Sequence, residues 1–214
     1  MAKKRVCCYI DGFNLYHSIA ALGSNCNHLK WLNLWALSNA YIKSSKEKLV
    51  KVYYFSAIAY WLKDSSARHK QFIEANKNLG VTPILGNFKK KTRQCKSCGA
   101  KWTEHEEKQS DVNLAIYLVN DAHLNKFDKA FVLSADSDLC PPIDLVINNC
   151  KKEAAILIPP NRYKITRELR NRQQVTAYKI KLKHLKANQL PNTIRNETGE
   201  IIIKRPEEYI QNKN

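Results

Sequence analysis

The 214-residue chain lacks several features that define whole classes of protein. No apolar stretch approaches the roughly 18 residues that a membrane-spanning helix requires, so we expect no transmembrane segment. The apolar run that follows the basic N-terminus covers only residues 6–10, which is too short for the core of a signal peptide. Internal repeats and long low-complexity segments are also absent from the sequence. We therefore expect a cytoplasmic protein that does not associate with membranes.

Acidic residues are scarce, and this scarcity points to the kind of partner. The sequence has 19 Asp and Glu residues against 36 Lys and Arg residues, which gives a net charge of +17. Such an excess favours a polyanion as partner, and nucleic acid is the usual one. A basic surface that is merely solvated is the alternative. The sequence leaves the oligomeric state open, and a homo-oligomer is compatible with it.

Short apolar runs alternate with segments of helical periodicity. Strands are expected at residues 6–10, 50–58, 81–85, 129–134 and 154–158, and helices at 15–22, 33–42, 65–79, from 111 onward and at 141–149. This alternation implies right-handed crossovers and a mostly parallel sheet. We therefore expect an α/β domain over residues 1–180, with a basic, cysteine-containing insert at 86–109 and a basic C-terminal extension at 181–214.

Two helices carry further local signals. Asn33 is expected to cap the helix at 33–42. The helix that starts at Asp111 has an apolar stripe that predicts its buried face, formed by Val112, Ala115, Ile116 and Val119. We expect Asp121 and Asp144 to be solvated helix residues.

Four aspartates occupy positions where predicted strands end or a helix begins. Asp11 follows the first strand, Asp136 and Asp138 follow the fourth, and Asp111 opens a helix. Carboxyl ends of parallel strands meet at one crevice, where clustered carboxylates repel each other unless a cation joins them. Mg²⁺ and Mn²⁺ prefer such oxygen ligands. The sequence therefore predicts a divalent metal site with Asp11 and Asp136 as direct ligands.

A helix cap is the alternative role for each aspartate taken alone. Asp111 and Asp138 both lie where an N-cap would sit, so this alternative applies to them most strongly. For Asp11 and Asp136 it is the least plausible. We expect Asp111 and Asp138 to act on the metal directly or through water, and Asn14 and Ser134 to orient water or phosphate.

Three motifs that contain these aspartates occur in a fixed order. They are Tyr9-Ile10-Asp11-Gly12-Phe13-Asn14-Leu15, Lys108-Gln109-Ser110-Asp111-Val112-Asn113 and Ser134-Ala135-Asp136-Ser137-Asp138-Leu139-Cys140-Pro141. Together they resemble the NYN domain family, in the LabA-like branch of the PIN-like nucleases, over residues 5–180. The resemblance implies a PIN-like three-layer α/β/α fold whose clustered aspartates bind divalent metal and cleave RNA. It also implies catalytic roles for Asp11, Asp111, Asp136 and Asp138, and for Asn14.

The basic insert contains one Cys-x-x-Cys-Gly motif, at Cys95 and Cys98. Two thiolates at this spacing form half of a tetrahedral zinc site, and His105 is the nearest further ligand. Cys26 and His28 are alternatives for completing the site, whereas His105 and Glu107 are alternatively expected to face the acidic site. A pair of ordinary reduced cysteines is the non-metal interpretation. The remaining cysteines that lie in or beside apolar segments are expected to be small core residues; these are Cys7, Cys8, Cys140 and Cys150.

Basic clusters are expected to follow a phosphate backbone with little sequence selectivity. The substrate-binding candidates are Lys89, Lys90, Lys91, Arg93, Arg162, Lys164 and Arg167, and residues 179–186 form a third basic stretch. Phe88 and Trp102 flank the first cluster and are expected to stack on unpaired bases. We expect Trp31, Trp35 and Trp61 to be core residues.

These features favour a metal-dependent endoribonuclease that uses Mg²⁺ or Mn²⁺, with a structural zinc as a further expectation. The alternative is a non-catalytic module of the same fold that binds nucleic acid or a protein. A small-molecule phosphatase with an Asp-x-Asp nucleophile is disfavoured, because residue 13 is Phe.

Overall fold

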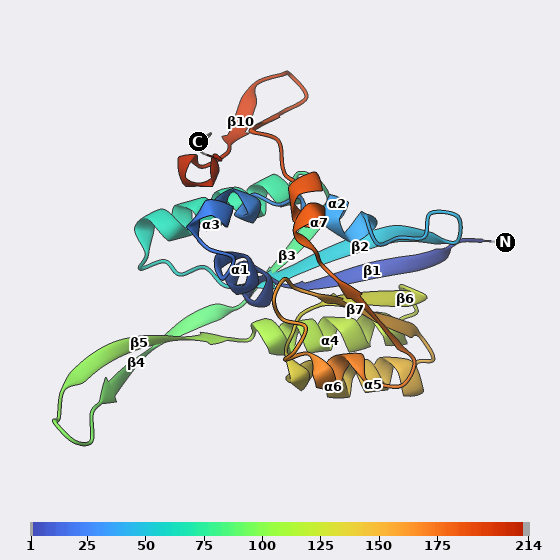
Figure 1. The fold of residues 1–214 in the computed structure, drawn as a ribbon, viewed down its shortest axis with the longest axis horizontal. Helices are drawn as coiled ribbons and strands as arrows, with labels where there is room; N and C mark the ends of the chain where they lie inside the picture. Colours follow the sequence, from blue (N-terminus) through green and yellow to red (C-terminus); the bar gives the residue numbers. More distant parts are fainter. Residues whose placement is uncertain (1, 212–214) are drawn as a thin grey trace.

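The computed structural model describes residues 2–211, and its centre is a six-stranded parallel sheet (Figure 1). The strand order is β3-β2-β1-β6-β7-β8. The strands are β1 (Lys4–Asp11), β2 (Glu47–Ser56), β3 (Val81–Leu85), β6 (Lys129–Leu133), β7 (Glu153–Ile158) and β8 (Val175–Lys179). All neighbouring pairs run parallel. Five of these strands were predicted. The sixth, β8, lies at the sheet edge and is largely exposed, so it lacks the apolar run that marks the others.

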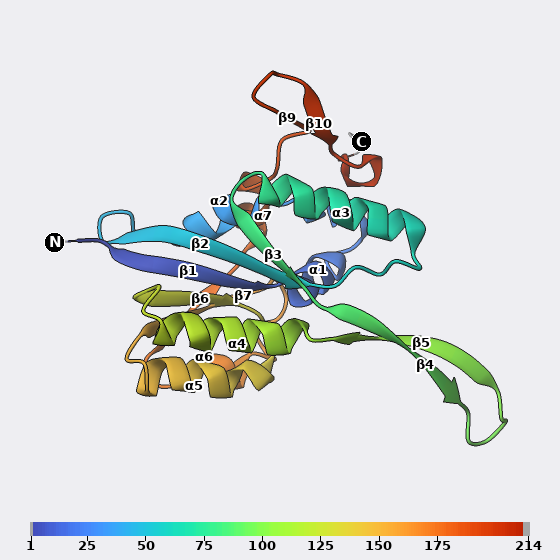
Figure 2. The ribbon, with the colours of Figure 1, turned by 180° about the vertical axis from the view of Figure 1, so that it is seen from behind.

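Helices cover both faces of the sheet, which confirms the expected three-layer α/β/α arrangement (Figures 1 and 2). One face carries α1 (Gly12–Ala20), α2 (Leu34–Asn39), α3 (Lys63–Lys77) and α7 (Leu182–Ala187), together with the 3₁₀ helix η1 (Ser24–Lys30). The other carries α4 (Ser110–His123), α5 (Cys140–Asn148) and α6 (Arg167–Arg170), with η2 (Ser137–Leu139). Each layer has its own apolar core against the central strands. Among the described residues, no helix combines the length and apolarity needed to cross a bilayer.

Helix α4 buries a different face from the one predicted. Val112 and Ile116 are 59% and 58% exposed, whereas Leu114, Leu118 and Ala122 are buried. Both stripes are apolar, so periodicity alone could not choose between them. Asp121 was expected to be solvated, but it shares the buried face and accepts a hydrogen bond from the Tyr9 hydroxyl at 2.9 Å. By contrast, the predicted cap of α2 is confirmed, since Asn33 accepts a hydrogen bond from Ala36 N at 2.9 Å.

Residues 86–109 form a long antiparallel hairpin instead of a compact knuckle. It consists of β4 (Asn87–Gln94) and β5 (Lys101–Lys108) and projects away from the sheet (Figure 2). Gly86 allows its close entry, because a Cβ there would lie 2.4 Å from the Lys108 carbonyl oxygen. The hairpin base leads directly into α4, so its position affects the start of that helix.

The C-terminal segment packs on the α1–α3 side of the molecule. Ile180, Leu185 and Leu190 are buried in the core of that layer. The Trp31 indole N–H donates to the Pro191 carbonyl at 2.9 Å. Beyond it, β9 (Thr193–Arg195) and β10 (Ile201–Lys204) pair antiparallel, and η3 (Glu207–Tyr209) returns toward η1. The described part of the extension is therefore integrated into the fold.

Candidate acidic active site

The acidic crevice lies where the connections of the sheet change direction. From β1 the chain runs outward to β2 and β3, and it then returns to the other side of β1 to form β6, β7 and β8. Ile10 of β1 is in register with Leu133 of β6, so Asp11 and Ser134 leave adjacent strands at the same level. Ligands of open α/β sheets bind in the crevice at such a switch point.

Asp11 is held rigidly at the centre of this crevice. It is 3% exposed and accepts hydrogen bonds from Asn14 N at 2.9 Å and from the Ser134 hydroxyl at 2.8 Å. The Asn14 side-chain amide donates to it as well. Burial raises the pKa of Asp11 above its ordinary value, although these hydrogen bonds act in the opposite direction and the Asp136 charge adds to the rise. A buried carboxylate with little access to water is thereby fixed in one orientation.

Gly12 allows α1 to begin directly after this aspartate. A Cβ at Gly12 would lie 2.7 Å from both the Phe55 carbonyl oxygen and the Tyr54 ring. Any other residue would therefore force β2 and α1 apart and would displace Asp11 from the strand end.

Asp136 and Asp138 occupy the loop that follows β6. Asp136 N donates to the Ser134 hydroxyl at 3.1 Å, so Ser134 connects this loop to Asp11. The Asp136 side chain accepts from Asp138 N at 3.0 Å and begins η2. Asp136 is half-buried and Asp138 is exposed.

The cap alternative was ranked wrongly among the four aspartates. Asp11 and Asp136 are the capping residues of α1 and η2, whereas Asp111 and Asp138 lie inside their helices. A cap must precede the first helical N–H groups, and aspartates at strand ends do so when a helix follows at once. Capping does not remove Asp11 and Asp136 from the crevice, since each retains carboxylate lone pairs.

Asp111 approaches the crevice from α4. Gln109, at φ 81°, turns the backbone before this helix. The pKa of Asp111 is raised to about 6, first by burial and then by the charges of Asp11, Asp136, Glu107 and Asp138. Four carboxylates from three other segments of the chain are thus close enough to disfavour its ionised form.

Glu107 is a further carboxylate at this crevice. This position agrees with the alternative in which Glu107 faces the acidic site. Its Oε1 accepts from Ser110 N at 3.1 Å at the start of α4. The Ser110 hydroxyl beside it is buried without a hydrogen-bond partner. Glu107 was not among the main predicted site residues, because its position depends on the hairpin. Its spacing of two residues from His105, which places both side chains on one face of β5, was a usable signal in the sequence.

The donor set fits a hard divalent cation, because it consists of carboxylates and hydroxyls with uncompensated negative charge. Within residues 2–211, no three acidic, histidine or cysteine side chains converge closely enough to enclose an ion. Mg²⁺ commonly takes one or two protein carboxylates and keeps several waters. An ion at this crevice would therefore be held by one or two carboxylates and would keep several of its waters.

The expected grouping of Cys95, Cys98 and His105 is not found. The cysteines lie at the turn of the hairpin, where Cys95 N bonds to the Ala100 carbonyl, whereas His105 pairs with Lys90 farther down. Along β4, Cys95 lies five residues beyond Lys90, the partner of His105, which corresponds to a distance of roughly 17 Å. The His105 ring stacks on Trp61 with centroids 3.7 Å apart. The alternative ligand Cys26 packs against the core.

The two cysteines lie in the tight turn that joins β4 to β5. Backbone N–H groups of Cys98 and Ser97 lower the pKa of Cys95 below its ordinary value. Gly99 completes the turn at φ 70°. Two thiolates at this turn would supply half of a tetrahedral zinc site.

The basic hairpin residues divide between its two faces. Lys89, Lys91 and Arg93 share one face with Glu104 and Glu106. Arg93 is paired with Glu104 at 2.6 Å and Lys91 with Glu106 at 3.9 Å. Lys90 is on the other face, which it shares with Phe88, His105 and Glu107. Because acidic partners offset part of the first face, Lys90 is better placed for a ligand at the crevice.

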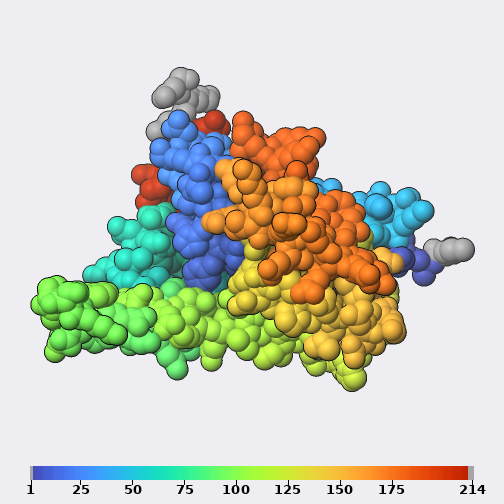
Figure 3. Space-filling view, turned by 60° about the horizontal axis from the view of Figure 1, so that its bottom comes forward, coloured from blue at the N-terminus to red at the C-terminus, as the bar shows by residue number. Residues whose placement is uncertain are grey.

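The second basic cluster borders the crevice from the opposite side. Lys164 and Arg167 are exposed and Arg162 is half-buried, in the segment that follows β7. Helix α6 within this segment packs against η2, which Asp136 caps. Figure 3 shows the N-terminal segment in blue, the hairpin in green and the yellow-to-orange part of the chain meeting on one face.

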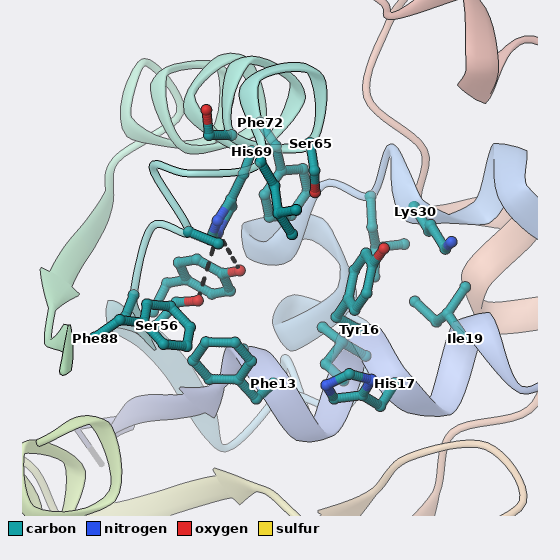
Figure 4. Close-up of a pocket in the computed structure, with 18 of the residues that line it drawn as sticks. Phe13, Tyr16, His17, Ile19, Lys30, Ser56, Ser65, His69, Phe72 and Phe88 are labelled. Atoms are coloured by element: carbon teal, nitrogen blue, oxygen red, sulfur yellow. Dashed lines mark hydrogen bonds between the residues drawn. The ribbon is translucent and has the colours of Figure 1, made fainter. Parts of the chain in front are cut away.

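A cavity of about 360 Å³ lies beside the crevice, among α1, α3 and the hairpin base (Figure 4). Trp61 lines it and is 41% exposed, so its expected core role is wrong. Trp31 is fully buried, as predicted. Sequence reasoning missed this cavity because its lining comes from segments far apart in the chain.

Comparison with known proteins identifies the family. The NYN domain profile matches residues 5–181. A crystal structure of a protein of unknown function from Vibrio parahaemolyticus aligns with a TM-score of 0.52 and 16% identity, covering 82% of this chain and 93% of that one. This likeness supports the fold alone. Comparison with curated proteins gave no match. Since the profile covers most of the sequence, the chain belongs to the NYN domain family, which has a nuclease-like fold.

Proposed function

We propose that the protein is a metal-dependent ribonuclease that hydrolyses phosphodiester bonds in RNA held along its basic surface. The observation that carries this proposal is the accumulation of negative charge at the switch point. Burial, and then four neighbouring carboxylates, raise the pKa of Asp111 to about 6, in a chain whose net charge is +17. A divalent cation would remove this repulsion, and the surrounding basic residues would attract phosphate.

Asp11 and Asp136 are the proposed protein ligands of Mg²⁺ or Mn²⁺, with Asp111, Asp138 and Glu107 acting directly or through water. A bound ion at this place would lower the pKa of a water molecule and stabilise developing charge on phosphate oxygens. Ser134 and Asn14 hold the Asp11 carboxylate in a fixed orientation. Such fixed dipoles reduce the reorganisation that a reaction requires.

Positive side chains on both borders of the crevice have a separate role. Lys90 on the hairpin and the cluster of Arg162, Lys164 and Arg167 would hold the phosphates on either side of the reacting one. Such contacts fix position and carry little sequence information. We therefore expect salt-sensitive binding with weak sequence preference.

The experiment is cleavage of end-labelled single-stranded RNA by the purified protein in Mn²⁺, with EDTA as the metal-free arm. We expect Asp11→Asn and Asp136→Asn to lose at least about a hundredfold in rate, because each removes a charged ligand. Asp144→Asn is the matched control, since Asp144 lies on α5 and pairs with Arg172 at 3.1 Å. Equal cleavage by the parent and Asp136→Asn would refute the proposal and indicate a contaminating nuclease.

A non-catalytic binding module gives a different result in the same experiment. The parent would then bind RNA without cutting it in any divalent metal. Asp11→Asn would bind more tightly, because it removes a negative charge that repels phosphate.

A further inference from the structure

The cavity beside the acidic crevice has the size and the lining of a small-molecule site. Its volume is about 360 Å³, within the range of about 300–1,000 Å³ that is typical of ligand pockets. No carboxylate of the described residues lines it, and Lys30 is the one Lys or Arg side chain among the lining residues. The cavity therefore suits a flat, uncharged group whose negatively charged part, such as a phosphate, lies outside the cavity.

Aromatic rings form the walls of the cavity. The Phe13 ring meets Phe88 edge-on at 5.9 Å between centroids, and Trp61 meets Phe88 edge-on at 4.7 Å. Tyr16 and Trp61 remain 42% and 41% exposed although they border an apolar space. Unburied aromatic side chains around a cavity indicate a ligand that completes their packing.

The inner end of the cavity is polar but uncharged. The His69 Nε2 atom lies 3.1 Å from the Tyr54 hydroxyl and 3.5 Å from the Ser56 hydroxyl (Figure 4). Burial lowers the pKa of His69 to about 4, so its ring is neutral at pH 7. A neutral imidazole and hydroxyl groups can both donate and accept hydrogen bonds, as the edge of a heterocyclic base requires.

The cavity and the crevice share two walls. Gly12 and Phe13 line the cavity and directly follow Asp11. On the hairpin, Phe88 is paired with Glu107 across the strands, so a ring of the cavity lies opposite a carboxylate of the crevice. Directly opposed residues of an antiparallel pair have Cβ atoms about 4.5–5.5 Å apart. A phosphate at the crevice would therefore have its own or the adjacent nucleoside within reach of the cavity.

We propose that this cavity receives one unpaired nucleobase of the strand whose phosphate lies at the acidic crevice. This inference rests on the proposed function, since it assumes nucleic acid at that crevice. The free face of Trp61 stacks on the base, the perpendicular Phe88 ring borders it, and Ser56 and His69 contact its edge. A paired base is already stacked and bonded within a duplex, so the site selects single-stranded segments or loops.

The test measures binding without cleavage. An eight-nucleotide single-stranded RNA is titrated in EDTA by fluorescence anisotropy, and one abasic residue is then placed at each position in turn. The parent is compared with Trp61→Ala and Trp61→Phe. Tyr60→Ala is the matched control, because Tyr60 is the neighbouring aromatic residue, is 66% exposed and does not line the cavity.

We expect one abasic position to weaken binding to the parent by about tenfold, the effect of losing one stacked base. Trp61→Ala should show the same loss with the intact RNA and no further loss with that abasic RNA. Trp61→Phe should recover most of the affinity, and Tyr60→Ala should match the parent. A fully paired duplex should show no dependence on residue 61.

Three results would overturn the inference: a flat abasic scan, equal effects of Trp61→Ala and Tyr60→Ala, or equal losses by Trp61→Ala on intact and abasic RNA. The readout also separates this inference from the nuclease proposal. Metal-dependent cleavage with a flat abasic scan would refute the base site alone. A position-specific penalty without cleavage in Mn²⁺ would refute the nuclease and retain the base site.

Discussion

Neutralising Asp111 should stabilise the metal-free protein, although it removes a residue of the proposed active site. The pKa of this carboxyl rises from 3.8 to about 6 in the fold. A rise of this size corresponds to a cost of about 3 kcal/mol above pH 6 for holding the charge in the crevice. Burial contributes most to the rise, but the Asp111 residue remains largely accessible to solvent at the rim, so screening reduces this cost to about 1–1.5 kcal/mol.

A smaller effect opposes this gain. Asp111 lies in the first turn of α4, where a negative charge interacts favourably with the helix dipole by about 0.3–1 kcal/mol. The cost of holding the charge, from burial and then from repulsion, is the larger of the two, so Asp111→Asn should be more stable by about 0.5–1 kcal/mol at pH 8. For a chain of this length, that difference raises Tm by about 1–4 °C.

Urea unfolding in EDTA between pH 8 and pH 4 measures this difference. The folded-state pKa is above that of the unfolded state, so the folded protein binds the extra proton between about pH 4 and pH 6, and the cost of the charge grows as pH rises through this window. The advantage of Asp111→Asn should therefore be largest at pH 8 and disappear near pH 4. A less stable variant at pH 8, or a difference that does not change with pH, would refute the reasoning.

Three further predictions concern other parts of the molecule. Burial lowers the pKa of His69 from 6.5 to about 4, so the free energy of unfolding should be highest above pH 6.5 and should fall by up to about 3 kcal/mol toward pH 4, where the buried ring must be protonated. In urea titrations, His69→Gln should lose this dependence on pH. Glu47→Gln should cost about 3–5 kcal/mol, because it leaves the buried Lys129 ammonium without its partner at 2.9 Å, and the double variant Glu47→Leu/Lys129→Met should regain most of it. Lys90→Ala should lower the slope of log K against log salt for single-stranded RNA by about 0.7, whereas no change would exclude a phosphate contact.

The arrangement of the sheet and the position of the crevice were accessible from sequence. Parallel strands buried on both faces appear as continuous apolar runs, and their carboxyl ends lie on one side by construction. Asp11 and Asp136 follow two such runs, so the sequence could predict that they lie near each other without any information on the loop conformations. The edge strand β8 lacks this signal and was missed.

Features that depend on the hairpin could not be predicted in this way. The alternation along β5 directs Glu107 and His105 to one face, but the direction in which the hairpin leaves the sheet decides what they meet. Trp61 was expected in the core because its neighbours are apolar, whereas it stacks on His105 at the cavity mouth. The distance between the Cys95 turn and His105 likewise became evident only from the strand pairing.

Anomalous diffraction from crystals soaked in Mn²⁺ tests the central claim most directly. The account predicts one strong manganese peak within coordination distance of Asp11 or Asp136, with water completing the shell and Asp111 or Glu107 adjacent. Crystals of Asp136→Asn should lose this peak while retaining the fold. A parent crystal with an open crevice and no peak there, at a Mn²⁺ concentration that supports RNA cleavage in solution, would contradict the account.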